Sequence, residues 1–471
     1  MKYIAVFLLF FSNLFSQSKM DIIDNLIYQG EFSQAKNIIF EEISSNSNNF
    51  NYVYDLNFKL DLMKRILIDF NRTKADVISY FQKYYPNVDD SFLEKLESEK
   101  KLEMKVIDGQ KRYFRNAARN VFRKDKEMNA HRISIDGKDE RVLDSFLLQI
   151  TSDIIKEAEK TGKNYVLPKK LRVNYTLSVK PDAVEEGEII RCWLPYPKEN
   201  QLRQKNVKLL NVNSANYIVA PDSYDQRTLY IEKKAIKGEP TVFKYSFSYD
   251  AFAEYNFIDF EKEYSLPKDS DVFKEYTQEV APHIVFTPGI KELSSKIIGS
   301  ETSLIKKVKL IYEWINYNIP WASAIEYSTI PAISSYCLTN MHGDCGIQTL
   351  LFITLCRYNG IPARWQSGWM LHPVEVNLHD WSEIYFEETG WIPVDQSFKL
   401  LDSPDQKIRY FFVGNTDQFH FIVNTNYSQP LFPAKIYPRS ETVDFQRGEV
   451  EYRGGNLYFD KWTYNLELIE E

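Results

Sequence analysis

Two different periods of hydrophobic residues divide the chain. From about residue 20 to residue 165, apolar positions recur every three or four residues, which is typical of amphipathic helices. Gly30 breaks the first helical stretch, and Ser91 with Glu94 has the spacing of a capping box. The stretches with this period are residues 21–43, 57–71, 73–85, 90–106 and 139–160. We therefore predict a helical N-terminal domain.

From about residue 171 the pattern changes to alternation of apolar and polar residues. The alternation is cleanest in residues 173–179 and 241–249. Residues 189–195 and 227–231 are also apolar and rich in strand-forming side chains. Turn-forming residues such as Pro, Asp and Gly separate these segments. The pattern predicts a small antiparallel β-sandwich that ends near residue 255.

A third region, about residues 265–400, mixes both patterns. Residues 304–317 form a predicted amphipathic helix, whose apolar face carries Ile305, Val308, Ile311, Tyr312 and Ile315. A second helix begins at Cys345 and ends before Gly360. Predicted strands follow at residues 364–370, 380–386, 391–395 and 419–423. The fold class is therefore predicted as α+β.

The N-terminus has the composition of a signal peptide. Lys2 precedes a short apolar run at residues 4–15, and small residues follow it. No later stretch is long and apolar enough to cross a membrane, so we expect no membrane span after signal removal and a periplasmic or secreted protein. The predicted segments are a signal peptide (1–18), a helical domain (19–165), a β-sandwich domain (166–262), an α+β core (263–400) and a β-rich C-terminal extension packed on the core (401–471).

Composition narrows the function classes. The chain has 471 residues, of which 44% are hydrophobic and 26% charged, so it can bury sizeable cores. Its formal net charge is -7. Because a nucleic-acid binder relies on clustered basic residues, and no long basic block stands out, we expect no nucleic-acid partner.

Three residues carry the candidate chemistry. Cys345 follows Asp344, a good helix N-cap, and His379 and Asp395 follow on two predicted antiparallel strands. Neighbouring strands can bring their side chains within hydrogen-bond distance. A helix N-terminus favours a thiolate, and Gly346 leaves room for a substrate carbonyl. The set supplies a nucleophile, a base and a group that orients the base.

Two simpler interpretations compete with this one. A cysteine at a helix start is often only structural, and a Cys, His and Asp set can also bind a metal. Zinc sites usually need three or four ligands at short spacing, and that spacing is missing, so we expect no metal and no cofactor. Of the other cysteines, Cys192 and Cys356 are predicted to be buried apolar residues, whereas the state of Cys337 is left open.

The motifs around these residues resemble the transglutaminase-like superfamily, a branch of the papain-like thiol enzymes. They are Gly-Asp-Cys at 343–345, Gly-Ile-Pro-Ala-Arg at 360–364, His-Asp-Trp-Ser-Glu at 379–383 and Gly-Trp-Ile-Pro-Val-Asp at 390–395. The resemblance covers residues 305–400, and the preceding β-sandwich is similar to one found in many members. It implies a papain-like core and a catalytic triad of Cys345, His379 and Asp395.

The resemblance also implies an oxyanion hole and a reaction type. The backbone N–H of Cys345 is one expected donor, and Trp321 and Tyr336 are the side-chain candidates. Acyl transfer through a Cys345 thioester predicts a cysteine peptidase, an amidase or an acyltransferase. The expected substrate is a peptide or protein, with a cell-wall peptide or a glycopeptide as candidates. The alternatives are a crosslinking transglutaminase, a glycopeptide amidase, or a non-catalytic binding or scaffold protein of the cell envelope.

Overall fold

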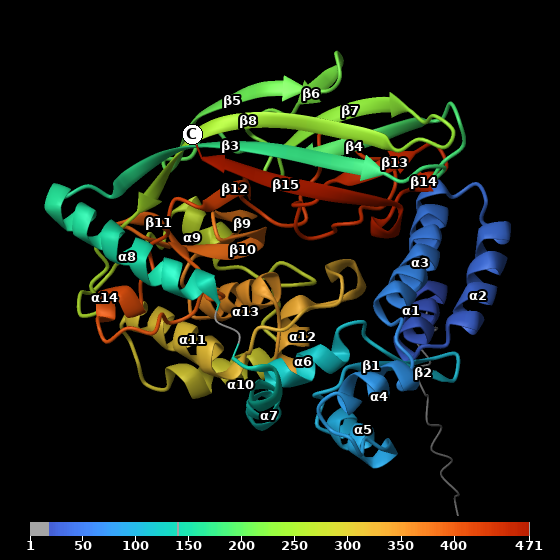
Figure 1. The fold of residues 1–471 in the computed structure, drawn as a ribbon, viewed down its shortest axis with the longest axis horizontal. Helices are drawn as coiled ribbons and strands as arrows, with labels where there is room; N and C mark the ends of the chain where they lie inside the picture. Colours follow the sequence, from blue (N-terminus) through green and yellow to red (C-terminus); the bar gives the residue numbers. More distant parts are fainter. Residues whose placement is uncertain (1–17, 139–140, 471) are drawn as a thin grey trace, which may run out of the picture. The chain divides into compact units, whose positions relative to one another are not determined.

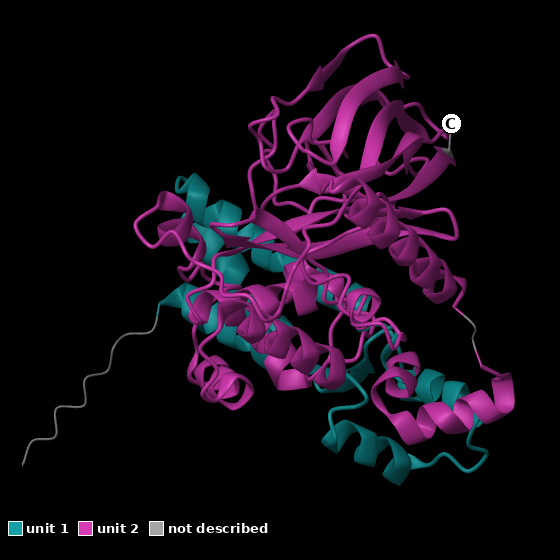
Figure 2. Ribbon diagram, turned by 90° about the vertical axis from the view of Figure 1, so that its left-hand side faces the viewer, with its two compact units in different colours: residues 1–118 teal, residues 119–471 magenta. Residues whose placement is uncertain are grey.

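The computed structural model describes residues 18–138 and 141–470. The predicted signal peptide lies outside these residues except for Ser18, so the signal peptide and the localisation stay predictions. The chain forms two compact units, residues 1–118 and 119–471, which Figure 2 colours teal and magenta. Within the described residues, none of the helices has the length and apolar character needed to span a bilayer.

The first unit is mainly helical, as its hydrophobic period predicts. Its elements are α1 (Lys19–Gln29), α2 (Phe32–Ser45), α3 (Phe50–Asp69), α4 (Lys74–Gln82), α5 (Asp90–Ser98), β1 (Met104–Ile107) and β2 (Gln110–Tyr113). Gly30 ends α1 with φ of 86°, and a Cβ there would meet the carbonyl oxygen of Val106 at 1.9 Å. The chain can therefore turn at this position only with glycine.

One helix prediction in this unit was right about where the helix begins, at Asp90, but wrong about its cap and its end. The N-cap of α5 is Asp89, whose side chain accepts from the backbone N–H of Phe92, so Ser91 is not the cap. The helix ends at Ser98, and β1 occupies the end of the segment predicted to be helical. The Asp89 cap precedes Ser91 by two residues, and the pairing of β1 with β2 outweighs helix propensity after Ser98.

The chain continues through α6 (Ala117–Lys124), α7 (Lys126–Asp136) and α8 (Val142–Thr161) into a two-sheet sandwich. Its strands are β3 (Tyr165–Val179), β4 (Ile189–Pro195), β5 (Gln204–Val212), β6 (Tyr217–Val219), β7 (Thr228–Lys234), β8 (Thr241–Glu254), β13 (Glu449–Tyr452), β14 (Gly455–Asn456) and β15 (Trp462–Glu470). The sheet orders are β14-β13-β4-β7-β6 and β15-β3-β8-β5, and all neighbours are antiparallel. Thus the last three strands complete the sandwich (Figure 1).

The α+β region holds one antiparallel sheet in the order β11-β10-β9-β12. Its elements are α9 (Asp271–Tyr276), α10 (Pro288–Ile298), α11 (Leu304–Asn318), a 3₁₀ turn (Tyr327–Thr329), α12 (Ile333–Asn340), α13 (Cys345–Tyr358), β9 (Ala363–His372), β10 (Glu375–Phe386), β11 (Gly390–Val394), α14 (Gln406–Arg409) and β12 (His420–Asn424). The five residues predicted for the apolar face of α11 are all buried. The helix α13 packs against β9 and β10 and is buried from Gly346 to Arg357.

A shared aromatic core fixes this sheet against the sandwich. The ring of Trp369 on β9 stacks on Tyr175 of β3 at 5.2 Å and on Phe421 of β12 at 5.1 Å. All three side chains are fully buried. Such contacts contribute beyond their buried area, and they fasten β9 and β12 to β3 of the sandwich. The side chains that these strands carry into the interior are therefore rigidly placed.

Candidate functional site

Cys345 is the first residue of α13, as its sequence context predicts. The carboxylate of Asp344 accepts the backbone N–H of Ile347 at 3.2 Å and so caps the helix. Gly343 packs on Ile347, where a Cβ would come within 2.4 Å of a methyl group. It also bridges to Trp321, which brings the chain before α12 beside the helix start. The thiol is therefore held at a fixed helix N-terminus.

His379 and Asp395 meet across β10 and β11. The register pairs Ser382 with Val394, which leaves Asp395 beside the His379 end of β10. Nε2 of His379 donates to Oδ2 of Asp395 at 2.5 Å. Nδ1 of this ring then carries the lone pair, because a neutral imidazole protonates only one nitrogen. Among the described residues no hydrogen bond engages Nδ1.

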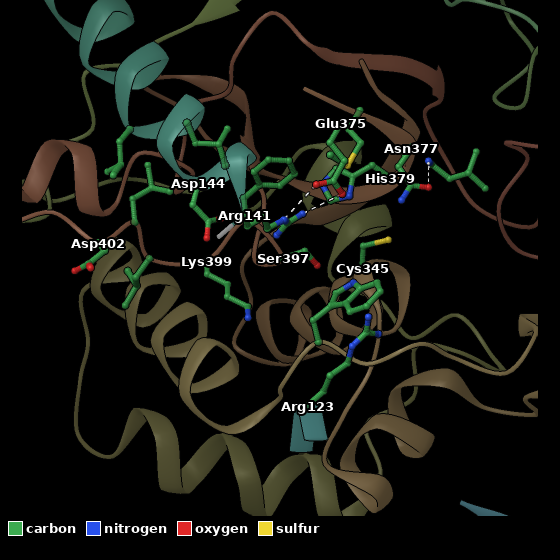
Figure 3. Close-up of a pocket in the computed structure, with 18 residues that line it drawn as sticks. Arg123, Arg141, Asp144, Cys345, Glu375, Asn377, His379, Ser397, Lys399 and Asp402 are labelled. Atoms are coloured by element: carbon green, nitrogen blue, oxygen red, sulfur yellow. Dashed lines mark hydrogen bonds and ion pairs between the residues drawn. The ribbon is translucent and has the colours of Figure 1, made fainter. Parts of the chain in front are cut away.

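A cavity of about 690 Å³ opens over this pair, lined by both Cys345 and His379 (Figure 3). Trp321 also lines it, and the guanidinium of Arg123 lies 4.5 Å from the centre of its indole. Tyr336 is not among the lining residues and instead packs on His342 from α12. The oxyanion role stays a prediction for Trp321, and the position of Tyr336 gives it no support.

Asp380 was not among the predicted site residues, yet it contacts the nucleophile. The Cys345 thiol donates to Oδ2 of Asp380 at 3.4 Å, and the side-chain amide of Gln446 donates to Oδ1 at 2.6 Å. Adjacent strand residues normally point to opposite faces, so a residue next to His379 gave no reason to expect this contact. Gln446 comes from the C-terminal extension, which the sequence does not connect to the site.

The space over Gly346 is filled by side chains. A Cβ at this position would lie 2.3 Å from the Tyr327 hydroxyl and 2.7 Å from Oδ2 of Asp380. The Tyr327 hydroxyl donates to Asp344 at 2.7 Å. Gly346 therefore makes room for this half-buried tyrosine and for the buried Asp380 carboxylate, and the expectation that it leaves room for a substrate carbonyl was wrong.

The acidic neighbours of Cys345 favour a neutral thiol, whereas the sequence predicted a thiolate. Burial of the sulfur, then Asp380 and Asp344, raise the pKa of Cys345 well above its usual range. Burial and the nearby Asp344 likewise raise the pKa of Asp380. The helix N-terminus alone favours a thiolate, but desolvation and buried acids act against it here. The resting nucleophile is a neutral thiol.

Alkylation of Cys345 by iodoacetamide should follow from this. We expect a rate that still rises above about pH 8.5, the ordinary titration range of a free thiol, because the thiolate is disfavoured. Mass spectrometry of the modified peptide, sampled over time across pH, measures it. The isosteric Asp380→Asn variant removes the acidic neighbour and should react faster than wild type at about pH 8. A wild-type rate of alkylation that levels off below about pH 8.5 would contradict a raised pKa of the Cys345 thiol.

Three further buried residues extend the His379–Asp395 pair, and the sequence did not identify them. Nε2 of His420 on β12 donates to Oδ2 of Asp395 at 3.0 Å, and its Nδ1 lies 2.9 Å from Oδ1 of Asp417. Nε2 of His372 on β9 lies 3.0 Å from Oδ2 of Asp417. These five residues form an unbroken hydrogen-bonded chain, here called the His–Asp chain. The local sequence pattern does not show that these residues meet, because the pairing of β12 with β9 brings them together.

Within the described residues, the His–Asp chain contains two groups of three side chains whose nitrogen and oxygen atoms lie close enough together to hold a metal ion. They are His372 with Asp417 and His420, and His379 with Asp395 and His420. Every member already bonds another member through a hydrogen bond of 2.5 to 3.0 Å. The buried Nδ1 atom of His372 has no hydrogen-bond partner, and the expectation of no metal stays a prediction.

The cysteines outside the cavity are structural. Cys192, Cys337 and Cys356 are buried and carry no disulfide, which confirms the prediction for Cys192 and Cys356. Of the four cysteines, Cys345 is thus the one that lines the cavity.

Arg364 on β9 fastens this strand to its neighbours. It donates to Glu383 at 2.7 Å and stacks on Trp391 at 4.1 Å.

The fold and site define a mixed α+β protein with a cysteine at the start of a buried helix and a His–Asp pair on the adjoining sheet. Residues 291–396 match the family model described as the transglutaminase-like superfamily. The chain therefore contains a transglutaminase-like domain, which confirms the resemblance of the motifs.

Two curated relatives are uncharacterised proteins. One, from Haemophilus influenzae, is 26% identical over 44% of this chain and 63% of its own length. The other, YebA from Bacillus subtilis, is 25% identical over 25% of this chain and 18% of its own length. The chain thus spans less than two thirds of either relative, and neither supplies an activity.

Two of the solved structures to which this chain is similar come from Cytophaga hutchinsonii and Pseudomonas aeruginosa. A candidate cysteine protease from Cytophaga hutchinsonii is 16% identical with a TM-score of 0.44, covering 65% of this chain and 92% of that chain. The periplasmic domain of TgpA from Pseudomonas aeruginosa is 14% identical with a TM-score of 0.26, covering 52% and 96%. Scores at this level carry no argument about activity.

Proposed function

We propose that this protein is a cysteine hydrolase that cleaves a peptide or amide bond through a Cys345 thioester. The observation that carries the proposal is the opening of the Cys345 thiol and the His379 imidazole into one cavity, with Asp395 behind the imidazole. The tautomer that Asp395 favours presents a lone pair at Nδ1, which suits a base that accepts the thiol proton.

The reaction follows the chemistry of these groups. Nδ1 of His379 takes the proton of Cys345 as the sulfur attacks the carbonyl carbon, and the carbonyl oxygen becomes an oxyanion. Collapse of this intermediate breaks the carbon–nitrogen bond, and His379 gives the proton to the departing amine. Water then attacks the thioester, His379 takes its proton, and the acid leaves as the proton returns to sulfur.

The protonation states favour general-base catalysis over a preformed ion pair. Burial and the charge of His420 lower the pKa of His379, although Asp395 raises it. The thiol pKa is raised as well. Both groups therefore rest neutral, and the proton moves as the sulfur attacks. Charge develops chiefly on the carbonyl oxygen, for which the Cys345 N–H and Trp321 are the proposed donors.

The acceptor decides between hydrolysis and transfer. Water is the abundant acceptor, which favours hydrolysis, and the proposed location in the periplasm or outside the cell makes a cell-wall peptide or a glycopeptide the substrate class. A crosslinking transglutaminase would use an amine as acceptor at the same thioester. A non-catalytic envelope scaffold would keep the fold without turnover.

An unbiased screen of peptides and glycopeptides should find a cleaved amide. Wild-type protein is incubated with each pool in the presence and absence of an amine donor, and mass spectrometry reports hydrolysed and aminated products. We expect hydrolysed product to dominate, because water is present at far higher concentration than any amine. Amination faster than hydrolysis would make the protein a transglutaminase. No turnover of any pool would favour the scaffold.

A further inference from the structure

The His–Asp chain joins β9, β10, the segment after β11 and the start of β12, and it ends at the cavity. We propose that His420 is a positioning residue, a permanently protonated imidazolium that shares Asp395 with His379 and thereby keeps His379 neutral and able to accept a proton. This inference rests on the proposed function, because His379 is the base of that reaction.

The protonation of His420 follows from its partners. Both of its ring nitrogens face carboxylate oxygens, Asp395 at 3.0 Å and Asp417 at 2.9 Å. A carboxylate can only accept, so each ring nitrogen must carry a hydrogen. His420 is 1% exposed, so bulk water does not reach the ring. Doubly protonated histidine between two carboxylates is the arrangement in which all these groups are satisfied.

Asp395 is equally constrained to remain an anion. Its Oδ2 accepts from the Nε2 atoms of both His379 and His420. Its Oδ1 accepts the backbone N–H groups of Ser397 at 2.9 Å and Phe398 at 3.2 Å. Four donors leave no position for a proton on this carboxylate. Although burial opposes charge, His379 and His420 hold the pKa of Asp395 below its usual range.

The consequence for His379 is electrostatic. The centres of the His379 and His420 rings are 5.4 Å apart in a buried environment. A cation at this distance disfavours a second proton on His379, and it also neutralises part of the attraction from Asp395. Despite burial, Asp417 and Asp395 raise the pKa of His420 to about 9, whereas the pKa of His379 is lowered. The two histidines that share the Asp395 carboxylate therefore differ in protonation: His420 is protonated on both nitrogens, and His379 is neutral.

Other charged and titratable groups surround the two rings. They are His372 on β9, Cys345 on α13, Asp380 on β10, Tyr312 on α11, Asp417 before β12, and Arg203, which precedes β5 and pairs with Glu254 at 3.9 Å. Arg203 donates to the backbone carbonyl oxygen of His420, and its guanidinium lies over the Trp381 ring at 5.6 Å. None of these groups lies between His379 and Asp395, which leaves His420 as the direct competitor for that carboxylate.

The test is nitrogen-15 NMR of histidine side chains in the full-length protein, which needs no substrate. The chain has six histidines, and loss of a signal in His379→Gln and His420→Gln assigns the two rings. In wild type we expect His420 to show two protonated nitrogens at neutral pH and His379 to be protonated only at Nε2. In His420→Gln the glutamine amide can still donate to Asp395 without carrying a charge, so the His379 pKa should rise by about one unit.

A matched control tests whether the change in the His379 pKa is specific to the loss of His420. His283 is a buried histidine whose ring accepts the backbone N–H of Ile333 outside the His–Asp chain, and His283→Gln should leave the His379 pKa unchanged. A neutral His420 in wild type at neutral pH overturns the proposal even if the variant does not fold. An unmoved His379 pKa in folded His420→Gln also overturns it. Absence of turnover on any substrate would instead defeat the proposed function and leave these NMR results standing.

Discussion

Cys345→Ala should abolish amide hydrolysis while leaving the fold almost unchanged. Without sulfur there is no nucleophile to form the thioester, and loss of a covalent nucleophile in a triad lowers kcat by about five to six orders of magnitude. Stability should change little, because the Asp344 cap of α13 does not involve the sulfur. The thiol loses one hydrogen bond to Asp380 at 3.4 Å, which is long and weak. Product formation by mass spectrometry and the thermal midpoint measure the two effects.

Cys356→Ala is the matched control for this variant. Cys356 lies in the same helix, and its side chain is fully buried away from the cavity. Truncation there should cost about 1 kcal/mol of unfolding free energy through the small void it leaves, with turnover retained. The two cysteines therefore separate catalysis from stability within one helix. Equal turnover in wild type and Cys345→Ala would end the thioester mechanism.

The elements that carry Cys345, His379 and Asp395 could be predicted because their signals are local. Asp344 before Cys345 marks the start of α13, and alternation followed by the turn at Gly390 marks β10 and β11. Once those two strands pair, the position of His379 beside Asp395 follows from register. In such cases a short sequence window contains most of the information that the structure uses.

The contacts that set the chemistry could not be predicted in this way. His420 and Gln446 both come from the C-terminal extension, which adds β12 to the core sheet and three strands to the sandwich. That long-range pairing leaves no trace in the local pattern. The dipole of α13 favours a thiolate, but Asp380 and Tyr327 fill the space around Gly346 beside the sulfur. The pKa of Cys345 is therefore raised, and the thiol is neutral where the sequence predicted a thiolate.

Asp395→Asn should reduce kcat by about four orders of magnitude, with a smaller effect on KM. The asparagine side chain has one oxygen and one amide nitrogen in place of two accepting oxygens. If its oxygen keeps the backbone N–H groups of Ser397 and Phe398, its NH₂ group faces Nε2 of His379. His379 must then accept at Nε2 and carry its hydrogen at Nδ1, so it presents a donor to Cys345 and can no longer take the thiol proton.

The opposite rotamer of the asparagine gives a different failure. Its oxygen would then accept from His379, but the NH₂ group would face two backbone donors and the loop after β11 would lose its anchor. An unsatisfied buried donor costs about 1 to 3 kcal/mol, so this arrangement lowers stability, whereas the first turns the NH₂ group toward the protonated Nε2 of His420 and lowers both stability and catalysis. Nitrogen-15 NMR of His379 distinguishes the two, because only the first protonates Nδ1. Asp405→Asn, at the exposed cap of α14, should retain full turnover. Wild-type kcat in Asp395→Asn would show that His379 is oriented by the surrounding rings alone, since Trp381 stacks on it at 5.7 Å and Phe398 meets it edge-on at 4.8 Å.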